Sequence, residues 1–433
     1  MPQGARIYNL FPLLAGNARD WESHLDRIGD MGFNWIFINP IHYPGFSGSL
    51  YAVKDYFALN PLFDDGSKDE ADVIISRFLD AARERGIAVM MDLVINHTAK
   101  DSLLAETHPD WFAHEADGSL ASPFAVDPDD TSKRTVWADL AEIDYSERPA
   151  RKEVVAYFAK LVRHSIKLGF RGFRCDAAYK VPKDIWRALI AAGQKEQDDI
   201  LFVAENLGSL LEETLAMRGA GFDYLFNSAK WWDFRAHWLF EQYDKFRAIA
   251  PSVTFPETHD TDRLANELVA KGITGARALE QRYRRAYLFS AVFATGVMIP
   301  IGYEYGFRKQ LHVVNSRPTD WEKPLFDITG YIAAVNKMKA ALPVLNEEGP
   351  QREVLLADGR VACLQRRAMR GTGWTVTAVN NDFDAPVTTR IEWLDPDIKE
   401  GRDVTPEGGE EQPFRAGGEL TLQPGEVRVF ASL

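Results

Sequence analysis

The sequence predicts an α/β fold: a (β/α)8 TIM barrel with an inserted loop domain after its third strand and a C-terminal all-β sandwich. Three observations support this prediction. Apolar strand patterns alternate with helical patterns across residues 6–344, as they do in parallel barrels. A segment rich in Asp, Pro and Trp interrupts the alternation once, after the third strand pattern. Short β runs with turn signals then replace the alternation at the end of the chain.

Eight apolar runs are predicted to be the barrel strands, because near-continuous apolar sequence is typical of strands buried on both faces. They are residues 6–11, 34–40, 87–96, 172–176, 201–206, 222–227, 252–260 and 297–304. Several of the helical patterns between them end in Gly after Lys or Arg, as helix C-termini do. A doubly wound open sheet is the competing fold, but it usually carries a Gly-rich turn after its first strand, and none follows here.

The chain is expected to form three domains. Residues 1–97 and 149–344 are predicted to build the barrel. Residues 98–148 separate the third strand from its helix and are interpreted as the inserted domain. Residues 345–433 contain five short β runs and are predicted to form the sandwich.

The bulk properties restrict the class of partner. The chain has 433 residues, with 50 Lys and Arg against 63 Asp and Glu, giving a formal net charge of −13. This balance argues against nucleic acids and anionic membrane surfaces as partners. The two cysteines do not suggest a disulfide framework.

No targeting or membrane segment is predicted. The N-terminal residues lack the charged start and clean apolar run of a targeting segment. Residues 286–303 carry no charge, but Gly296, Pro300 and Gly302 interrupt them, so a helix–strand junction is the preferred interpretation. We therefore expect a cytoplasmic protein without a membrane partner; the oligomeric state is left open.

Polar residues gather where four of the predicted strands end. In a TIM barrel these ends converge on one face, which holds the active site. The residues are Asp92, Asn96, His97, Arg174, Asp176, Glu205, His259 and Asp260. Arg174 and Asp176 are two apart and so face the same side, while Cys175 between them is interpreted as a small core residue. Converging carboxyl groups are what cleavage of a glycosidic bond requires.

Four segments, DLVINH (92–97), GFRCD (172–176), FVAE (202–205) and ETHD (257–260), resemble those of the α-amylase family, glycoside hydrolase family 13. The resemblance covers about residues 6–433 and implies that Asp176 is the nucleophile, Glu205 the general acid/base and Asp260 a transition-state stabiliser. It further implies substrate contacts for Asp92, His97, Arg174 and His259, and a sugar-stacking role for Tyr51.

The sequence departs from the family pattern in two places. Gly48 stands three residues before Tyr51, where members that recognise a non-reducing end commonly have Asp. Tyr179 and Lys180 replace the Lys–His pair that many amylases carry after the nucleophile, so we expect these two residues to contact the acceptor. The Lys–His change also removes one calcium ligand. Asn96 and Asp139 still match two others, so the resemblance leaves a structural calcium ion open and implies no required cofactor.

The sequence is interpreted as a retaining enzyme that cleaves α-glucosidic bonds of short or unusual α-glucosides. A transglycosylase of the same family, a maltosyl- or glucosyltransferase, is the first alternative. A catalytically inactive sugar-binding barrel is the second, against which the intact acids argue. Four tryptophans near the expected cleft are candidates for stacking on sugar rings, although each is more commonly a core residue: Trp111, Trp137, Trp231 and Trp232.

Overall fold

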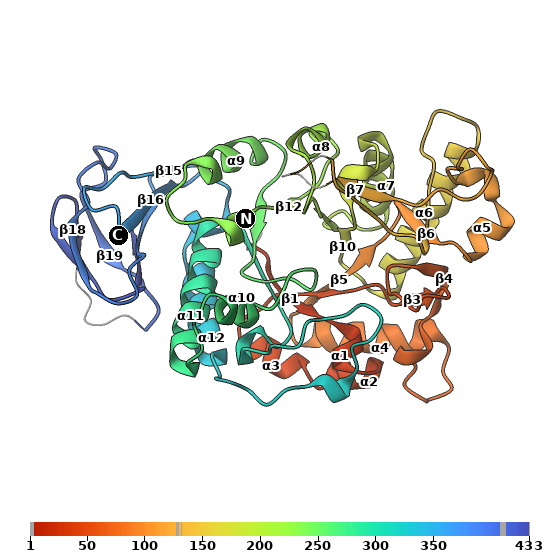
Figure 1. The fold of residues 1–433 in the computed structure, drawn as a ribbon, viewed down its shortest axis with the longest axis horizontal. Coiled ribbons are helices and arrows are strands. Elements are labelled where there is room, and N and C mark those ends of the chain that lie inside the picture. The colour runs from red at the N-terminus through yellow and green to blue at the C-terminus, as the bar shows by residue number, and fades with distance from the viewer. Residues whose placement is uncertain (1–3, 127–129, 131, 408–412, 433) are drawn as a thin grey trace.

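The computed structural model describes residues 4–126, 130, 132–407 and 413–432, and it confirms the predicted barrel. Eight parallel strands close in the ring order β1, β14, β13, β12, β11, β10, β5, β2 (Figure 1). Their bounds are β1 Arg6–Leu10, β2 Trp35–Ile38, β5 Ala88–Leu93, β10 Gly172–Cys175, β11 Leu201–Ala204, β12 Tyr224–Phe226, β13 Ser252–Thr254 and β14 Gly296–Pro300. Each predicted strand is present, and all eight end earlier than predicted because the last residues of each predicted run already belong to loops.

Helices surround the barrel and follow the predicted pattern. In α7, for example, the buried Ile185, Trp186, Leu189 and Ile190 recur at helical spacing and face the sheet. Helix α6 ends at Leu168, and Gly169 follows it with a φ of +126°, which is open to glycine but costly for other residues. The α-helices are α1 Pro12–Ala15, α2 Ala18–Glu22, α3 Leu25–Asp30, α4 Ala71–Glu84, α5 Leu103–Thr107, α6 Ala150–Leu168, α7 Lys183–Glu196, α8 Leu211–Ala216, α9 Trp238–Phe246, α10 Leu264–Ala270, α11 Ala276–Phe293 and α12 Thr329–Ala341.

Short 3₁₀ helices occupy several of the connections. They are η1 Pro61–Phe63, η2 Pro109–Trp111, η3 Ala178–Lys180, η4 Ala229–Trp231, η5 Tyr303–Tyr305, η6 Pro318–Asp320 and η7 Pro343–Asn346. Three of them, η3, η4 and η5, directly follow barrel strands at the carboxyl end and therefore lie at the face where a TIM barrel carries its site.

Two small groups of strands follow barrel strands at this same carboxyl-end face. The segment after β5 contains β6 His97–Ala99, β7 Phe124–Val126, β8 Arg134–Val136 and β9 Leu140–Glu142. Strands β6 and β9 pair, and β7 and β8 pair, each antiparallel. A hairpin of β3 His42–Pro44 and β4 Val53–Leu59 follows β2 and was not predicted. Its register shifts break the regular alternation, which hid the strands in the sequence.

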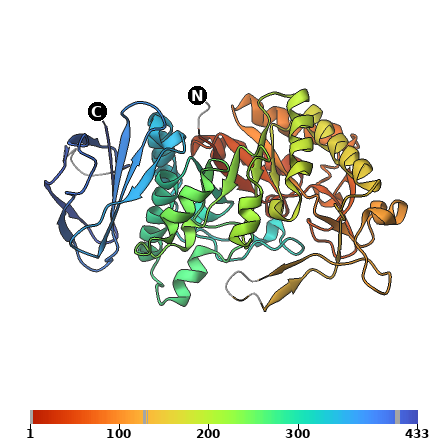
Figure 2. The same cartoon turned by 90° about the horizontal axis from the view of Figure 1, so that it is seen from above.

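The C-terminal part is all β, as predicted. One sheet has the order β15, β16, β17, β22, β19, β20, and β18 pairs with β21. The bounds are β15 Gln351–Glu353, β16 Val361–Arg367, β17 Trp374–Asn380, β18 Val387–Arg390, β19 Glu400–Asp403, β20 Phe414–Arg415, β21 Glu419–Leu422 and β22 Val427–Ala431. This part lies at one end of the molecule and the segment after β5 at the other, as Figures 1 and 2 show.

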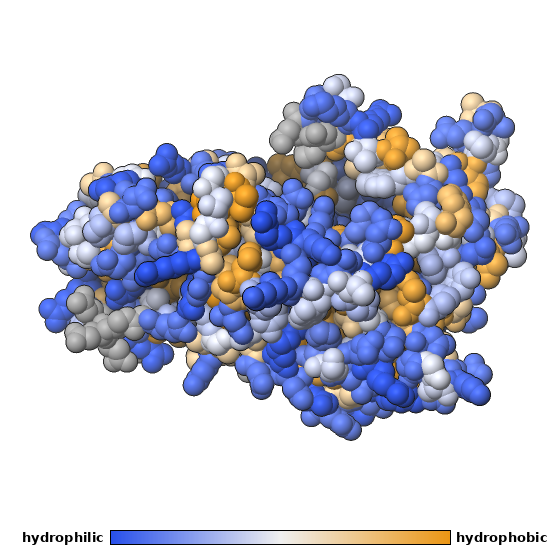
Figure 3. Space-filling view, turned by 60° about the horizontal axis from the view of Figure 1, so that its bottom comes forward, coloured by the Kyte–Doolittle hydropathy of each residue, from blue (hydrophilic) through white to orange (hydrophobic). Residues whose placement is uncertain are grey.

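The uncharged run 286–303 divides as expected into the end of α11 and strand β14. Among the described residues no helix combines the length and apolar character needed to cross a membrane. On the face shown in Figure 3, polar residues predominate and apolar residues lie in small groups between them.

Buried charges join the barrel to the C-terminal part. Glu348 is only 6% exposed, and its Oε1 accepts hydrogen bonds from the backbone N–H and hydroxyl of Ser252 at 3.1 and 2.5 Å. Its Oε2 accepts from the backbone N–H of Thr295 at 3.1 Å and lies 3.7 Å from Nη2 of the fully buried Arg366. That guanidinium also donates to the carbonyl oxygens of α11 residues Val292 and Phe293. One carboxylate thus ties β13 and the start of β14 to the linker and to the first sheet.

We expect Glu348→Ala to lower the free energy of unfolding by about 3 kcal/mol, because Arg366 and several buried donors would lose their acceptor. Urea denaturation followed by circular dichroism measures the change. The control is Glu392→Ala at an exposed position, which should change stability by no more than about 0.5 kcal/mol. A Glu348→Ala loss as small as the control's would contradict this role.

Candidate active site

Arg174 lies at the centre of a group of carboxyls at the carboxyl end of the barrel. Its side chain is 3% exposed, and its Nη1 donates to both oxygens of Asp92 at 3.0 and 2.9 Å. The same nitrogen donates to Oδ1 of Asp176 at 2.5 Å. Its Nη2 lies 3.7 Å from the nearest oxygens of Glu205 and Asp260. One buried guanidinium therefore offsets the mutual repulsion of four carboxyls.

Strand register brings these groups together. Arg174 on β10 is the direct partner of Asp92 on β5. Side chains two apart on a strand share a side, so Asp176 points with Arg174 into the mouth of the barrel. Cys175 is buried in the core between barrel and helices, as predicted. Glu205 follows the next strand, β11, and its backbone N–H donates to the carbonyl of Cys175.

The side chain of Glu205 is almost fully buried. It is 7% exposed, and its Oε2 accepts from the backbone N–H of Ala177 at 2.9 Å. Burial, together with the nearby charges of Asp176 and Asp260, raises the pKa of Glu205 to about 7, although Arg174 opposes the rise. A carboxyl with such a pKa is protonated in a large fraction of molecules near neutral pH, as a general acid must be.

The backbone that presents this N–H is strained. Ala177 has φ +42° and ψ +45°, a left-handed conformation that is unfavourable for a residue with a Cβ. It directly follows Asp176, and it turns the chain from β10 into η3. Strained backbone tends to occur where function fixes the local geometry, and here it aims a donor at the carboxyl of Glu205.

Tyr51 is held by its hydroxyl as well as by its ring. The hydroxyl donates to Oδ2 of Asp92 at 2.7 Å, lies 2.8 Å from Nε2 of His259 and accepts from Nδ2 of Asn39 at 2.9 Å. The ring lies parallel to the imidazole of His259, with 5.9 Å between their centroids. Asn39 in turn accepts a hydrogen bond from Nδ2 of Asn9. Neither asparagine was assigned to the site from the sequence, although each stands near the carboxyl end of an apolar strand pattern, β1 for Asn9 and β2 for Asn39.

Two histidines retain buried nitrogens that have no hydrogen-bond partner among the described residues. They are Nε2 of His97 and Nδ1 of His259. Burial lowers the pKa of both imidazoles, so both are neutral and can donate or accept. Buried unpaired polar groups are rare and call for a ligand or water. The Nε2 of His259 also lies 3.1 Å from Oδ2 of Asp260, whose side chain is half exposed.

These groups border a pocket of about 390 Å³, within the size range of small-molecule sites. Of the predicted site residues, the lining includes Tyr51, Asn96, His97, Asp139, Arg174, Asp176, Tyr179, Lys180, Glu205 and Asp260. Asp92 and His259 are absent from the lining and support Arg174 and Tyr51 from behind. Trp137, one of the four candidate stacking tryptophans, also lines the pocket. Phe124 and Val313 line it too and were not assigned to it from the sequence, because only the fold brings these segments to the barrel mouth.

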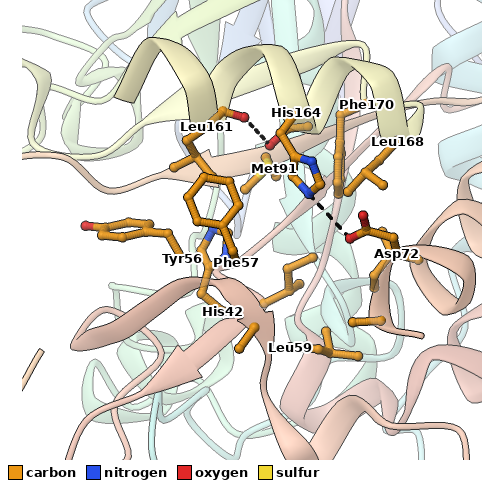
Figure 4. A pocket seen from close by; sticks show the side chains of 15 residues that line it. His42, Tyr56, Phe57, Leu59, Asp72, Met91, Leu161, His164, Leu168 and Phe170 are labelled. Atoms are coloured by element: carbon orange, nitrogen blue, oxygen red, sulfur yellow. Dashed lines mark hydrogen bonds and ion pairs between the residues drawn. The ribbon is translucent and has the colours of Figure 1, made fainter. Parts of the chain in front are cut away.

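A second cavity lies between the β3–β4 hairpin and helices α4 and α6 (Figure 4). His42 and Tyr56 line it, and Nε2 of His164 lies 3.3 Å from Oδ1 of Asp72 at its edge. Its volume of about 30 Å³ suits a water molecule rather than a sugar ring. The pocket at the barrel mouth is therefore the candidate active site.

Several known proteins are similar to this chain. Residues 3–124 match the family model of the glucanotransferase domain of glycogen debranching enzyme. The α-1,4-glucan:maltose-1-phosphate maltosyltransferase of Burkholderia pseudomallei is 26% identical over 382 residues, which are 86% of this chain and 32% of that protein. The intracellular maltogenic amylase of Bacillus subtilis is 24% identical over 215 residues, 47% of this chain and 34% of that protein. This chain thus spans about a third of the length of each.

A solved structure matches over the full length. The α-amylase of Geobacillus thermoleovorans, solved with acarbose, superposes with a TM-score of 0.77 at 18% identity and covers 100% of this chain and 99% of that one. This likeness shows the fold. The matched family model and the amylase relatives support assignment of the chain to the α-amylase family, glycoside hydrolase family 13.

The first departure from the family pattern, Gly48 in place of Asp, is explained by the backbone conformation at this position. Gly48 has φ +73°, where a residue with a Cβ is strained, and a Cβ added there would lie 3.6 Å from Cγ1 of Val314. The neighbouring Leu50 donates its backbone N–H to the carbonyl of Val313. The loop that carries Gly48 is thus joined to the loop after β14, and this backbone disfavours the Asp that other members use.

The second departure changes the floor of the pocket. Tyr179 is packed partly into the core, and burial raises the pKa of its hydroxyl. Lys180 turns its ammonium to Oε1 of Glu213 at 2.9 Å. The ammonium also lies 5.1 Å from the centroid of the Tyr179 ring and 5.9 Å from that of Phe124. An aromatic surface with a paired cation therefore replaces the usual Lys–His pair of this family.

The calcium site that the resemblance left open has few of its ligands in this structure. Asn96 and Asp139 border the same pocket, but the Lys180 ammonium borders it too, and Nδ2 of Asn96 faces Nδ1 of His97 at 3.5 Å. Within the described parts of the chain, no three His, Cys, Asp or Glu side chains form a metal-binding group. Calcium takes six to eight oxygen ligands, so these residues do not fit it, and the mechanism proposed below involves no metal.

We expect the carboxyl of Glu205 to titrate with an apparent pKa of about 7, because burial disfavours its charge. Difference infrared spectroscopy of wild type against Glu205→Gln isolates its carboxylic-acid band. The band should be strong at acidic pH, half lost near pH 7 and absent at alkaline pH. Glu205 fully ionised at mildly acidic pH would contradict the description of its surroundings.

Proposed function

We propose that the protein is a retaining enzyme that cleaves α-glucosidic bonds of short α-glucans or α-glucosides, with Asp176 as nucleophile and Glu205 as general acid/base. The observation that carries the proposal is the pairing of two unlike carboxyls on one guanidinium. Asp176 is in direct contact with Nη1 of Arg174, whereas Glu205 is farther from Nη2 and has a raised pKa. Pairs of carboxyls in such different surroundings commonly divide the acid and nucleophile roles.

In the first step an oxygen of Asp176 attacks the anomeric carbon of the sugar. The bond to the leaving oxygen breaks, and that oxygen takes both bonding electrons and the proton of Glu205. Arg174 donates a hydrogen bond to Oδ1 of Asp176, which orients the carboxyl and leaves its other oxygen for the attack. The result is a glycosyl ester on Asp176 and an ionised Glu205.

In the second step Glu205 takes a proton from the acceptor hydroxyl, whose oxygen attacks the anomeric carbon. The ester bond to Asp176 breaks, and both carboxyls return to their starting states. Asp260 stands beside Arg174 and His259, where its charge can stabilise the positive sugar of the transition state. His97, with a free buried nitrogen, can bind a sugar hydroxyl.

Transfer to a second sugar is the alternative outcome of the same chemistry. It is favoured by the apolar lining of the pocket, where Phe124, Trp137 and Tyr179 offer flat aromatic surfaces to an acceptor sugar. The maltosyltransferase relative adds to this alternative. A barrel that only binds sugar is disfavoured because the three acids and Arg174 are all present and in contact range.

We expect the purified protein to act on maltooligosaccharides and to lose that activity in Asp176→Asn and Glu205→Gln. Losing a member of such a unit typically lowers kcat by orders of magnitude, on the order of 10⁴-fold. Products from maltooligosaccharides, with and without an added glucose acceptor, are separated by chromatography. Glucosyl phosphates, trehalose and sucrose are tested in parallel.

The product pattern decides between the candidates. Shorter chains alone indicate a hydrolase, and longer chains beside shorter ones indicate a transglycosylase. Asp55→Asn, which changes a half-buried carboxylate of the β4 strand away from the pocket, serves as the control and should keep its activity. A folded Asp176→Asn with wild-type turnover would contradict the proposed roles.

A further inference from the structure

The fold separates the four candidate stacking tryptophans into two classes. Trp111 and Trp232 are 4% exposed and belong to the core. Trp137 is 41% exposed and lines the pocket. Trp231 is 51% exposed and lies outside the pocket lining. Its exposure has no role in the site described so far.

Trp231 stands at the carboxyl end of the barrel. It ends η4, which directly follows β12. Its ring meets the ring of Phe255 edge-on, with centroids 6.0 Å apart and an interplanar angle of 84°. Phe255 follows β13 and belongs to the core inside the barrel, against which Leu207 also packs. Leu207 lines the pocket, so one apolar cluster inside the barrel is shared by a pocket residue and by the ring that supports Trp231.

The neighbours of Trp231 fix its backbone. On one side the Lys230 ammonium donates to the carbonyl of Pro256 at 3.1 Å and to Oε1 of Glu267 at 2.8 Å. On the other side the indole N–H of Trp232 donates to the carbonyl of Ala236 at 2.7 Å. A half-exposed ring on a fixed backbone, supported edge-on from below, offers a preformed flat face to a sugar ring.

The position of Trp231 also indicates which part of the substrate its ring would contact. Leu207 lies two residues after Glu205, and its backbone N–H donates to the Glu205 carboxyl. Glu205 is the group proposed to protonate the leaving oxygen. A chain that continues from that oxygen past Leu207 and across the carboxyl ends of β12 and β13 would meet the ring of Trp231.

We propose that Trp231 stacks on a glucose ring of the leaving or acceptor chain outside the pocket, so that the enzyme binds an extended α-glucan segment on this side. This inference rests on the proposed function and specifies its substrate as maltooligosaccharides rather than glucosides with a single short aglycone. The pocket binds the sugar ring whose glycosidic bond is cleaved, and Trp231 selects for chains long enough to extend outside the pocket.

The test compares chain lengths in Trp231→Ala, Trp231→Phe and wild type. The values of kcat/KM are measured for maltotriose and maltoheptaose. Only the longer chain reaches Trp231, so only its kcat/KM depends on the aromatic contact. The ratio of kcat/KM for maltoheptaose to that for maltotriose should therefore fall about fivefold in Trp231→Ala and little in Trp231→Phe. The control is Trp393→Ala, which removes a 70% exposed tryptophan from the C-terminal part and should keep the wild-type ratio.

An unchanged ratio in Trp231→Ala, or equal losses for both chains, would overturn the inference. If Trp231→Ala has a lowered Tm, Trp231→Leu keeps apolar bulk over Phe255 without an aromatic face and should give the same fall in ratio. A wild-type protein inactive on both oligosaccharides would contradict the proposed function itself. A wild-type protein active on both, with no length dependence on Trp231, would contradict this inference alone.

Discussion

The buried guanidinium of Arg174 is the interaction on which the site depends. Carboxyls of four barrel segments, Asp92, Asp176, Glu205 and Asp260, converge on it, and the first three of them are buried. Such a cluster would be costly without a buried counter-charge. The guanidinium supplies two nitrogens to it and lies 5.8 Å from the centroids of the rings of Phe37 and Tyr51. Two carboxyls of this cluster are the proposed nucleophile and general acid/base. Arg174 would therefore contribute both to the stability of the fold and to catalysis.

The differences among the four carboxyls follow from their contacts. Asp92 is fully buried and accepts hydrogen bonds from Arg174 and Tyr51, so burial raises its pKa while these donors oppose the rise. Glu205 receives backbone donors and only a distant guanidinium. Asp260 has a half-exposed side chain beside His259. One strand register thus places chemically similar groups in different surroundings, which is what an acid, a nucleophile and a stabiliser require.

The sequence predicted the parts that depend on strand periodicity. The eight apolar runs, and the polar residues at their ends, follow from burial on both faces of a barrel. Arg174 and Asp176 could be placed on one side because strands alternate. The roles of these residues came from the resemblance to the family and remain proposals, as do the domain boundaries.

Other features could not be predicted because they arise from contacts between distant segments. The β3–β4 hairpin has an irregular register, and Val313 reaches the pocket only through the loop after β14. The left-handed backbone of Ala177 has no sequence signal, because alanine usually avoids it. Likewise, the sequence could not separate the exposed Trp231 from the buried Trp232, since only the packing of η4 on Phe255 and Phe289 distinguishes them.

The central claim is that a covalent glycosyl ester forms on Asp176, and trapping that ester tests it most directly. A fluorinated α-glucosyl fluoride, whose fluorine slows the second step more than the first, is incubated with the native protein, and the protein is digested and analysed by mass spectrometry. The account predicts one added glycosyl group on the peptide that contains Asp176, and none in Asp176→Asn. A label on Glu205 or Asp260, or turnover of the reagent without any ester, would contradict it.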